Sequence, residues 1–244
     1  MSTLKSLILA AGKGTRMKSD LPKVVHRCNG EPMVHYVIEA SKEAGADKVC
    51  VRVGYKAEEV KNAITAPVAY ALQTEQLGTG HAVKCAKDFI GTEGNVIILC
   101  GDTPLITGKT LTDLVDTHNK GGYGVTVLSA ILEDATGYGR IVRDASGDFA
   151  KIVEHKDATE EERLVKEINS GMYVFNCKAL SEALDKLTND NAAGEYYLTD
   201  TIEIIKETGL KVAAMALTGS AVDEIRGVNT LEQLAEAEEI MKNR

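Results

Sequence analysis

The first half of the chain alternates short apolar runs with segments in which apolar residues recur every three or four positions. Short apolar runs are typical of buried strands, and the longer period is typical of helices that bury one side. Repeated alternation of strand and helix favours a parallel sheet with helices on both faces. The expected strands are 4–9, 49–53, 68–72, 95–100 and 124–131, and the expected helices are 31–44, 57–64, 81–89 and 110–120.

Helix 31–44 carries its own boundary signals. Pro32 is expected in its first turn, where the missing N–H of proline costs no hydrogen bond. Val34, Val37 and Ile38 form the apolar stripe that would face the sheet. Gly45 is expected to end the helix.

The pattern changes after residue 137. Residues 137–169 combine two short strand-like pieces with a Glu-rich helical turn and a turn sequence at 144–147, so we expect an insertion over the sheet. The strand-like pieces are 140–143 and 150–153. The strand–helix order then resumes with a strand at 171–176, helices at 180–187 and 199–207, a strand at 212–217 and a last helix that begins at Thr230, with Gln233 as its capping-box partner.

Composition argues against two classes of protein. A net charge of −8 disfavours a nucleic-acid surface, which needs a basic field. The apolar stretches are far shorter than the roughly 20 residues of a bilayer span, and Lys5 interrupts any N-terminal signal peptide. The five cysteines form no Cys-x-x-Cys pair and are expected to be reduced. We therefore expect a cytoplasmic protein with no nucleic-acid or membrane partner.

The segment LILAAGKGTRMKSDLPK, at 7–23, begins within the first expected strand, and its Gly-rich part directly follows that strand. A Gly-rich loop at the carboxyl end of a parallel strand lies where open α/β sheets bind ligands. The first 23 residues hold five basic residues and one acid, Asp20, so an anion is expected there. The loop lacks the third glycine of the dinucleotide fingerprint and the Gly-Lys-Ser/Thr of a P-loop. A flexible, solvated basic loop stays an alternative.

Several motifs together carry a family resemblance. The stretch 9–17 followed by Leu21-Pro-Lys23 is similar to the signature of the sugar-1-phosphate nucleotidyltransferases. The segments QTEQLGTGHA at 73–82, GYGR at 137–140 with VEHKD at 153–157, and GEYYLTD at 194–200 narrow the match. They resemble the uridyltransferase domain of the bifunctional N-acetylglucosamine-1-phosphate uridyltransferase/glucosamine-1-phosphate acetyltransferase family. The match runs from Leu4 to Leu231, and the hexapeptide repeats of that family are absent from these 244 residues.

The resemblance implies a fold and an activity. The fold would be Rossmann-like α/β with a predominantly parallel sheet, helices on both faces and a small β-rich insertion over the sugar site. One domain would span 1–244, with a nucleotide-binding half at about 1–110, a sugar-binding half at about 111–230 and a C-terminal helix at 230–244. The activity would be Mg²⁺-assisted transfer of the uridylyl group of UTP to N-acetylglucosamine 1-phosphate. This reaction gives UDP-N-acetylglucosamine, a bacterial cell-wall precursor, and pyrophosphate.

The resemblance also assigns the charged residues of the reaction centre. Arg16 and Lys23 would hold the triphosphate and neutralise charge as pyrophosphate leaves, while Lys13 is either a third phosphate contact or solvent-facing. Asp102, at the end of strand 95–100, would share Mg²⁺ with Asn229. The residues alone also allow Asp102 to cap a turn before a proline.

On the nucleotide side, Gln73 would pair its amide with the imide edge of uracil. The backbone of Gly78 and the side chain of Thr79 would follow it, and the backbone of Leu9, Ala10, Ala11 and Gly12 would close over the base. Without the family, a Gln after a strand is usually a surface residue.

On the sugar side, the resemblance points to Gly139, Glu154 and Asn169, with Tyr197 and Thr199 around the acetamido group. The alternative for Glu154 is an ion pair with Lys151 or Lys156 on a solvated hairpin. His81 and His155 are expected to be structural or supporting, because no nucleophile stands with them in a known signature. Cys100 stands where many members carry Tyr, which puts any sugar contact at that position in doubt.

Other functions remain open at this point. The nearest is transfer of a different nucleotide or to a different sugar phosphate. A non-catalytic sugar-nucleotide sensor would keep the fold and lose the charged residues of the reaction centre. A dinucleotide-binding oxidoreductase is disfavoured by the missing fingerprint glycine. The oligomeric state is not indicated.

Overall fold

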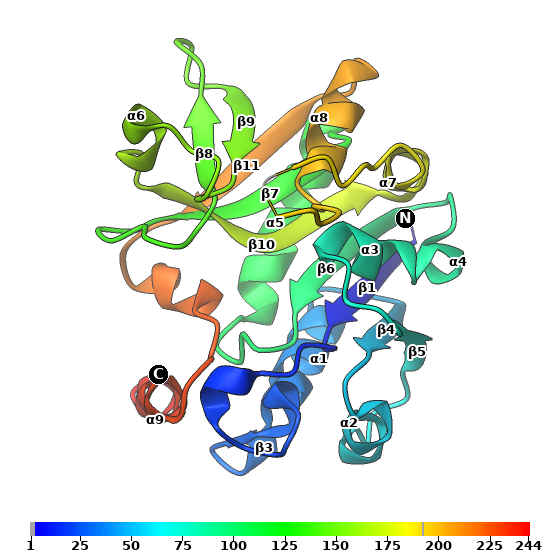
Figure 1. Cartoon of the computed structure of the whole chain (residues 1–244), viewed down its shortest axis with the longest axis vertical. Helices are drawn as coiled ribbons and strands as arrows, with labels where there is room; N and C mark the ends of the chain where they lie inside the picture. Colours follow the sequence, from blue (N-terminus) through cyan, green and yellow to red (C-terminus); the bar gives the residue numbers. More distant parts are fainter. Residues whose placement is uncertain (1–2, 192) are drawn as a thin grey trace.

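The computed structural model describes residues 3–191 and 193–244, and within them a nine-stranded mixed sheet runs through the molecule (Figure 1). Seven strands lie in the order β11-β7-β10-β6-β1-β4-β5, and β8 and β9 branch from β10. The seven are β1 (Leu4–Leu9), β4 (Lys48–Val53), β5 (Ala69–Leu72), β6 (Asn95–Cys100), β7 (Val125–Ile131), β10 (Glu167–Asn176) and β11 (Val212–Leu217).

The parallel order expected from the first half of the sequence is confirmed. β1 pairs in parallel with β4 and β6, and β4 pairs in parallel with β5. The exception is β10, which lies antiparallel between β6 and β7. It begins at Glu167, four residues before the expected strand, and its register shifts between Asn169 and Met172. Gly171 lies in this shift with φ +79°, which breaks the apolar alternation that marks a strand.

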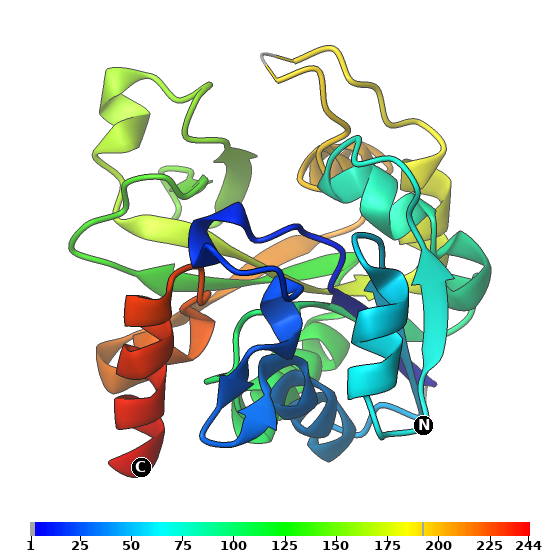
Figure 2. The same cartoon turned by 60° about the horizontal axis from the view of Figure 1, so that its bottom comes forward.

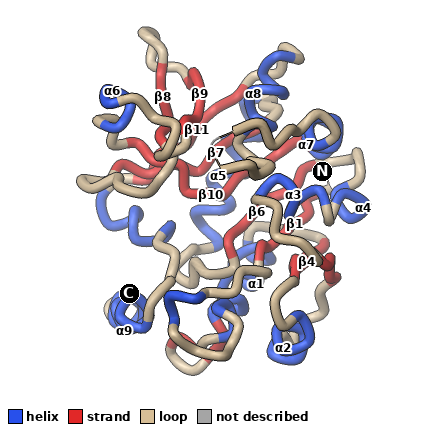
Figure 3. Tube along the Cα trace, in the orientation of Figure 1, coloured by secondary structure: helices blue, strands red, loops and turns tan. Residues whose placement is uncertain are grey.

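Helices cover both faces of the sheet, as predicted (Figure 3). The first face carries α1 (Met33–Glu43), α2 (Ala57–Ala63) and α5 (Gly108–Gly121), and the second carries α3 (Thr79–Lys84), α4 (Lys87–Ile90), α7 (Cys177–Leu184) and α8 (Asp200–Glu207). Each face has its own apolar core: Leu114 of α5 is fully buried in the first, and Leu180 of α7 in the second. No helix of the described residues is long and apolar enough to cross a membrane.

Three expected helices differ at their ends. The helix expected at 31–44 begins at Met33, because Glu31–Pro32 is a short strand, β3, paired with β2 (Arg27–Cys28). Pro32 has an extended ψ of 136° and precedes the first turn, while Gly45 follows the helix as predicted. The prediction of a single helix at 81–89 is wrong. The structure has two helices there, α3 and α4, which are separated at Ala86, whose φ of −105° and ψ of 15° are not helical.

The third difference concerns α7, which begins three residues before its expected start. The side chain of Asn176 caps it by accepting a hydrogen bond from the Ala179 N–H at 3.1 Å. The capping residue lies at the last position of β10, so strand and helix follow one another without a loop. An apolar period alone does not reveal such a boundary.

The expected insertion is present. β8 (Arg140–Arg143) and β9 (Phe149–Val153) form a hairpin that pairs with β10 at Ile168 and projects from the sheet (Figure 1). The Glu-rich turn is α6 (Glu160–Arg163), which begins with a capping box between Thr159 and Glu162.

The C-terminal segment returns to the loops that follow β1. After the 3-10 helix η3 (Gly219–Ile225), helix α9 (Leu231–Lys242) lies beside the β2–β3 hairpin (Figure 2), where the Asn29 N–H donates to Glu238 Oε1 at 2.9 Å. Thr230 caps α9 as predicted, accepting from the Gln233 N–H at 3.2 Å. In a capping box the Gln233 side chain would accept from the N–H of Thr230. It accepts instead from the N–H of the preceding residue, Asn229, at 2.7 Å.

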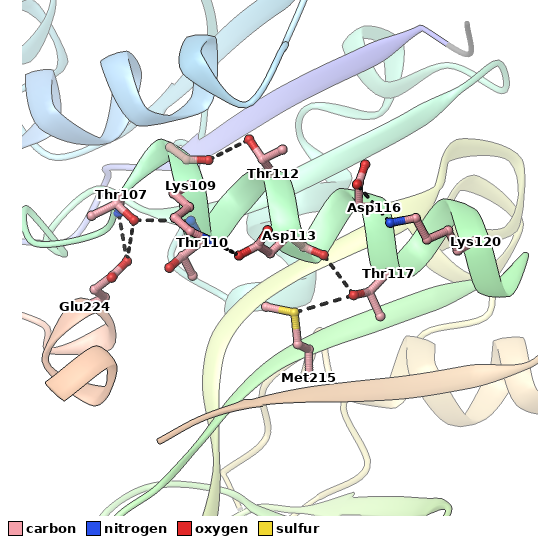
Figure 4. A network of polar contacts seen from close by, with 11 residues as sticks. Thr107, Lys109, Thr110, Thr112, Asp113, Asp116, Thr117, Lys120, Met215 and Glu224 are labelled. Atoms are coloured by element: carbon pink, nitrogen blue, oxygen red, sulfur yellow. Dashed lines mark hydrogen bonds and ion pairs between the residues drawn. The ribbon is translucent and has the colours of Figure 1, made fainter. Parts of the chain in front are cut away.

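η3 is tied to the start of α5 by a polar network (Figure 4). The backbone N–H and the hydroxyl of Thr107 both donate to Glu224 Oε2, at 3.0 and 2.8 Å. Thr107 also caps α5. Farther along α5, Asp116 pairs with Lys120 on the exposed side. The two hydrogen bonds that Glu224 accepts from Thr107 therefore hold the segment that leads to Asn229 against the start of α5.

We expect Glu224→Ala to lower the free energy of unfolding by about 1–2 kcal/mol, because two partly buried donors of Thr107 lose a charged acceptor. In a domain of this size that lowers Tm by about 2–4 °C for each kcal/mol. Thermal unfolding checks this, with Asp116→Ala as a control that removes an exposed carboxylate from the same helix region. Equal Tm values for the two variants would contradict the anchoring role.

Candidate active site

The candidate site lies at the carboxyl ends of the central strands. Leu9 of β1 is in register with Arg52 of β4 and Cys100 of β6, so the loops after these strands begin side by side. The segment after η3 joins them, because the Val228 N–H donates to the Asp102 carbonyl at 2.8 Å.

Four predicted residues meet there in one polar cluster. Lys23 Nζ donates to Asp102 Oδ2 and also to Asn229 Oδ1 at 2.8 Å. Arg16 Nη2 donates to the same Asn229 oxygen at 2.9 Å. The side chains of Lys23 and Asp102 are 16% and 19% exposed, so the ion pair is largely shielded from water. Segments separated by some 80 to 210 residues thus share one group of charges.

The loop between Gly12 and Lys23 places Arg16 and Lys23 on two short 3-10 helices. Arg16 lies on the 3-10 helix η1 (Thr15–Met17), and Lys23 begins η2 (Lys23–Val25). Gly14 has φ +64°, and a Cβ there would lie 2.5 Å from Lys23 Cβ. Only glycine allows this approach without moving the lysine.

Asp102 and Asn229 fit a magnesium site. Their Oδ2 and Oδ1 atoms converge on one ammonium group, so two oxygens already face a single positive charge. Mg²⁺ prefers oxygen ligands and commonly takes one or two from protein, with water and substrate phosphates completing the shell. Residues 3–191 and 193–244 contain no group of three or more His, Cys, Asp or Glu side chains that could hold a metal by themselves.

A pocket of about 310 Å³ lies at the same end of the sheet, and none of the four cluster residues lines it. Leu9 connects the two, because it lines the pocket and its carbonyl accepts from the N–H of Gly101, the residue before Asp102, at 2.9 Å. Six of the residues that line the pocket were predicted: Leu9, Ala11, Gly12, Gln73, Gly78 and Thr79. Gln73 is only 2% exposed, which rules out the surface role that its sequence position allowed. Its Nε2 donates to His81 Nδ1 at 2.9 Å, and its Oε1 is buried without a hydrogen-bond partner in the described chain.

Ala10 does not share this wall. Its N–H donates to the Arg52 carbonyl at 2.9 Å, and its side chain belongs to the core of the opposite face. Four lining residues were not predicted: Arg52, Gln76, Ala82 and Glu195. The signal for Arg52 was present in the sequence, because it is the one charged residue inside the buried run Val49–Val53.

The loop that carries Tyr197 and Thr199 closes over the start of α3. The Gly80 N–H donates to the Tyr196 carbonyl at 2.7 Å, and the Leu198 N–H donates to Thr79 Oγ1 at 3.1 Å. Gly78 has φ +106°, and a Cβ there would lie 2.5 Å from the Tyr196 carbonyl oxygen. This loop therefore links the pocket to the predicted sugar side.

On that side, the predicted residues are joined in two pairs. Thr199 Oγ1 donates to Glu154 Oε1 at 3.0 Å. The Asn169 N–H donates to the Gly139 carbonyl at 2.9 Å. Burial raises the pKa of the Glu154 carboxyl above its ordinary value, against the opposing effect of the hydrogen bond from Thr199.

The alternative ion pair of Glu154 with Lys151 does not form, because Lys151 pairs with Glu162 at 2.7 Å. His155 makes no hydrogen bond through its buried Nδ1 in the described chain. Cys100 lies against the register shift in β10, where a Cβ on Gly171 would be 3.4 Å from its Sγ. Burial raises the pKa of the Cys100 thiol to about 12, so the thiol stays protonated at neutral pH.

Comparison with known proteins gives close relatives across almost the whole chain. "Bifunctional protein GlmU" of Clostridioides difficile (strain 630) is 52% identical over 240 residues, covering 98% of this chain and 52% of the relative. The protein of the same name from Thermoanaerobacter pseudethanolicus is 55% identical over 244 residues, covering 100% of this chain and 53% of the relative. The chain thus spans about half the length of these curated relatives.

The fold has a counterpart among solved structures. A putative glucose-1-phosphate thymidylyltransferase from Bacillus anthracis, crystallised with sucrose, superposes with a TM-score of 0.78 at 17% identity, over 99% of this chain and 96% of that one. This confirms the fold class predicted from the sequence. The sequence model of the nucleotidyl transferase family matches residues 5–234. With the relatives above, it confirms the predicted resemblance: the chain belongs to the nucleotidyl transferase family.

Proposed function

We propose that this chain transfers the uridylyl group of UTP to N-acetylglucosamine 1-phosphate, giving UDP-N-acetylglucosamine and pyrophosphate. The observation that carries the proposal is the convergence of Arg16, Lys23, Asp102 and Asn229 at the same end of the sheet as the pocket of Gln73. The identity of more than half to the curated relatives supports it. Loss of one of these four side chains would favour a sensor without activity, and all four are present.

The reaction forms one bond and breaks one. An oxygen of the sugar phosphate attacks the α-phosphorus of UTP, and the bond from that phosphorus to the bridging oxygen of the β-phosphate breaks. Pyrophosphate leaves with the electron pair. The attacking oxygen is already anionic at neutral pH, so no side chain has to act as a base. Catalysis then rests on positioning and on charge stabilisation.

The cluster of Arg16, Lys23, Asp102 and Asn229 can supply both the positioning and the charge stabilisation. The Arg16 guanidinium is a fixed planar charge suited to two phosphate oxygens, and the Lys23 ammonium is a mobile point charge. Asp102 and Asn229 would hold Mg²⁺, which when bound offsets negative charge on the phosphates. Lys23, now bonded to both oxygens, would then turn to the triphosphate. Binding of the cation and release of the lysine are thereby linked.

Gln73 favours a base with a donor at its ring nitrogen. Since its Nε2 already donates to His81 Nδ1, the carbonyl Oε1 is left to accept. The N3–H of uracil meets this requirement, whereas the N3 of cytosine is an acceptor. His81 is therefore a positioning residue that fixes the amide, with its own proton on Nε2, 3.8 Å from Cys85 Sγ.

On the sugar side, Gly139, Glu154, Asn169, Tyr197 and Thr199 offer the neutral and acidic acceptors that sugar hydroxyls and an acetamido group require. A site built from such groups rejects a sugar that leaves them unpaired. We extend the proposal to a role in cell-wall precursor synthesis in the cytoplasm, by one domain with a nucleotide-binding and a sugar-binding half.

Pyrophosphate release with Mg²⁺ over a panel of nucleoside triphosphates and sugar 1-phosphates tests the proposal. We expect the fastest release with UTP and N-acetylglucosamine 1-phosphate. Asp102→Ala should lower it by about 100-fold or more, because an electrostatic group of the reaction centre is lost. Asp116→Ala, on the exposed side of α5, is the matched control. Release no faster than that of Asp102→Ala would refute the proposal.

Asp200 gives a pH-dependent test of the sugar side. Burial, with the neighbouring Glu154 and Glu203 carboxylates, raises its pKa to about 6. The folded state therefore binds more protons than the unfolded chain between this value and the ordinary Asp value of about 3.9. Stability from this group is present at low pH and is lost as the pH rises through about 6.

Asp200→Asn should accordingly unfold at a higher temperature than the wild type at pH 8, and this advantage should shrink towards pH 4. Thermal unfolding of both proteins between pH 4 and 8 measures it, with Asp190→Asn, on an exposed part of the preceding loop, as the control. A Tm difference that does not change with pH would show that Asp200 ionises normally.

A further inference from the structure

Arg52 is a buried arginine in the middle of the sheet. β4 lies between β1 and β5 (Figure 1). Val49, Val51 and Val53 point into the core of the first face, and Cys50 into that of the second. Strand alternation therefore places Arg52 on the face of Cys50, under α3. The residue is 6% exposed, although arginines are almost never this buried unless paired.

The guanidinium of Arg52 has no partner in the part of the chain that the structure describes. Its Nε is buried without a hydrogen bond, and none of the hydrogen bonds or ion pairs found within 3–191 and 193–244 involves its side chain. Only its backbone is used, accepting from the Ala10 N–H. Burial lowers its pKa to about 10, so the group remains charged at neutral pH. The N–H groups of its two terminal nitrogens are thus available to a ligand in the pocket.

These donors belong to the pocket of Gln73. Arg52 and Gln73 both line it. Arg52 is in register with Ala71, two residues before Gln73, so the two side chains share one face of the sheet. The pocket therefore combines a buried acceptor, Gln73 Oε1, with the guanidinium of Arg52, and neither has a hydrogen-bond partner among the described residues. An imide, in which an N–H lies between two carbonyl oxygens, complements this pair.

We propose that Arg52 is a specificity-determining residue that donates to a carbonyl oxygen of the uracil ring, next to the N3–H that Gln73 accepts. This inference rests on the proposed function and adds to it a base contact that the sequence motifs did not indicate. Without a ligand, the unpaired charge destabilises the fold. With uracil in place, the guanidinium gains an acceptor. A base without a carbonyl at that position leaves the donors unpaired and is rejected.

The test uses Arg52→Leu and the more conservative Arg52→Gln, with Arg27→Leu, an exposed arginine of the β2–β3 hairpin, as the control. Steady-state kinetics with UTP should show KM raised about tenfold or more in Arg52→Leu, with kcat changed far less, since a contact to the base acts before and during the reaction alike. Arg52→Gln should give a smaller increase, and Arg27→Leu none.

Thio-substituted nucleotides separate a direct contact from a structural role. 2-Thio-UTP and 4-thio-UTP each replace one carbonyl oxygen by the weaker acceptor sulfur. In the wild type, one of the two should lose affinity relative to UTP. In Arg52→Leu that same analogue should bind as well as UTP does. A thio effect of equal size in wild type and variant would overturn the inference.

Thermal unfolding adds a second readout. The Tm of Arg52→Leu without nucleotide should equal or exceed that of the wild type, while the rise in Tm on adding UTP should be smaller. A lower Tm with unchanged UTP kinetics would assign Arg52 a structural role and refute its contact with the base. Wild-type turnover separates the two proposals: absent turnover overturns the proposed function and this inference together, and turnover insensitive to residue 52 overturns only the inference.

Discussion

The contact of Lys23 with Asp102 and Asn229 holds the candidate site together. It joins the loop after β1, the end of β6 and the segment after η3, which are distant in sequence. β1 and β6 pair in the sheet, but the segment after η3 belongs to no strand. The ion pair is mostly shielded from water, so it is stronger than a surface pair and more costly to leave unmatched. The surrounding features serve it: Gly14 allows Lys23 to approach, and the Val228 N–H ties the last segment to the Asp102 carbonyl.

The same contact explains how so small a set of residues could support the proposed nucleotidyl transfer. The oxygens of Asp102 and Asn229 form a site for one positive charge, which a lysine fills in the structure and a divalent cation would fill during the reaction. The substrates bring the negative charge and the attacking group, so the protein has only to place and neutralise them. The pocket of Gln73 shows a similar feature, because Gln73 Oε1 and Arg52 Nε are buried without a hydrogen-bond partner among the described residues.

Local sequence patterns predicted the elements whose signals are local. The apolar runs gave β1, β4, β5 and β6 within one residue, and the loop motif brought Arg16 and Lys23 to the correct end of the sheet. Long-range features were missed. The antiparallel position of β10 depends on pairing with strands far along the chain, which no periodicity records. Likewise, Ala10 was expected at the pocket, but its side chain packs in the core of the first face. Arg52, for which no role was predicted from the sequence, lines the pocket instead.

The most direct measurement follows the oxygen atoms of the reaction. N-acetylglucosamine 1-phosphate labelled with ¹⁸O in its phosphate is incubated with UTP, Mg²⁺ and the protein. The ¹⁸O content of each product is then measured by mass spectrometry. Attack of the sugar phosphate on the α-phosphorus predicts that all the label appears in UDP-N-acetylglucosamine and none in pyrophosphate. Label in pyrophosphate, or no labelled sugar nucleotide, would contradict nucleotidyl transfer at this site.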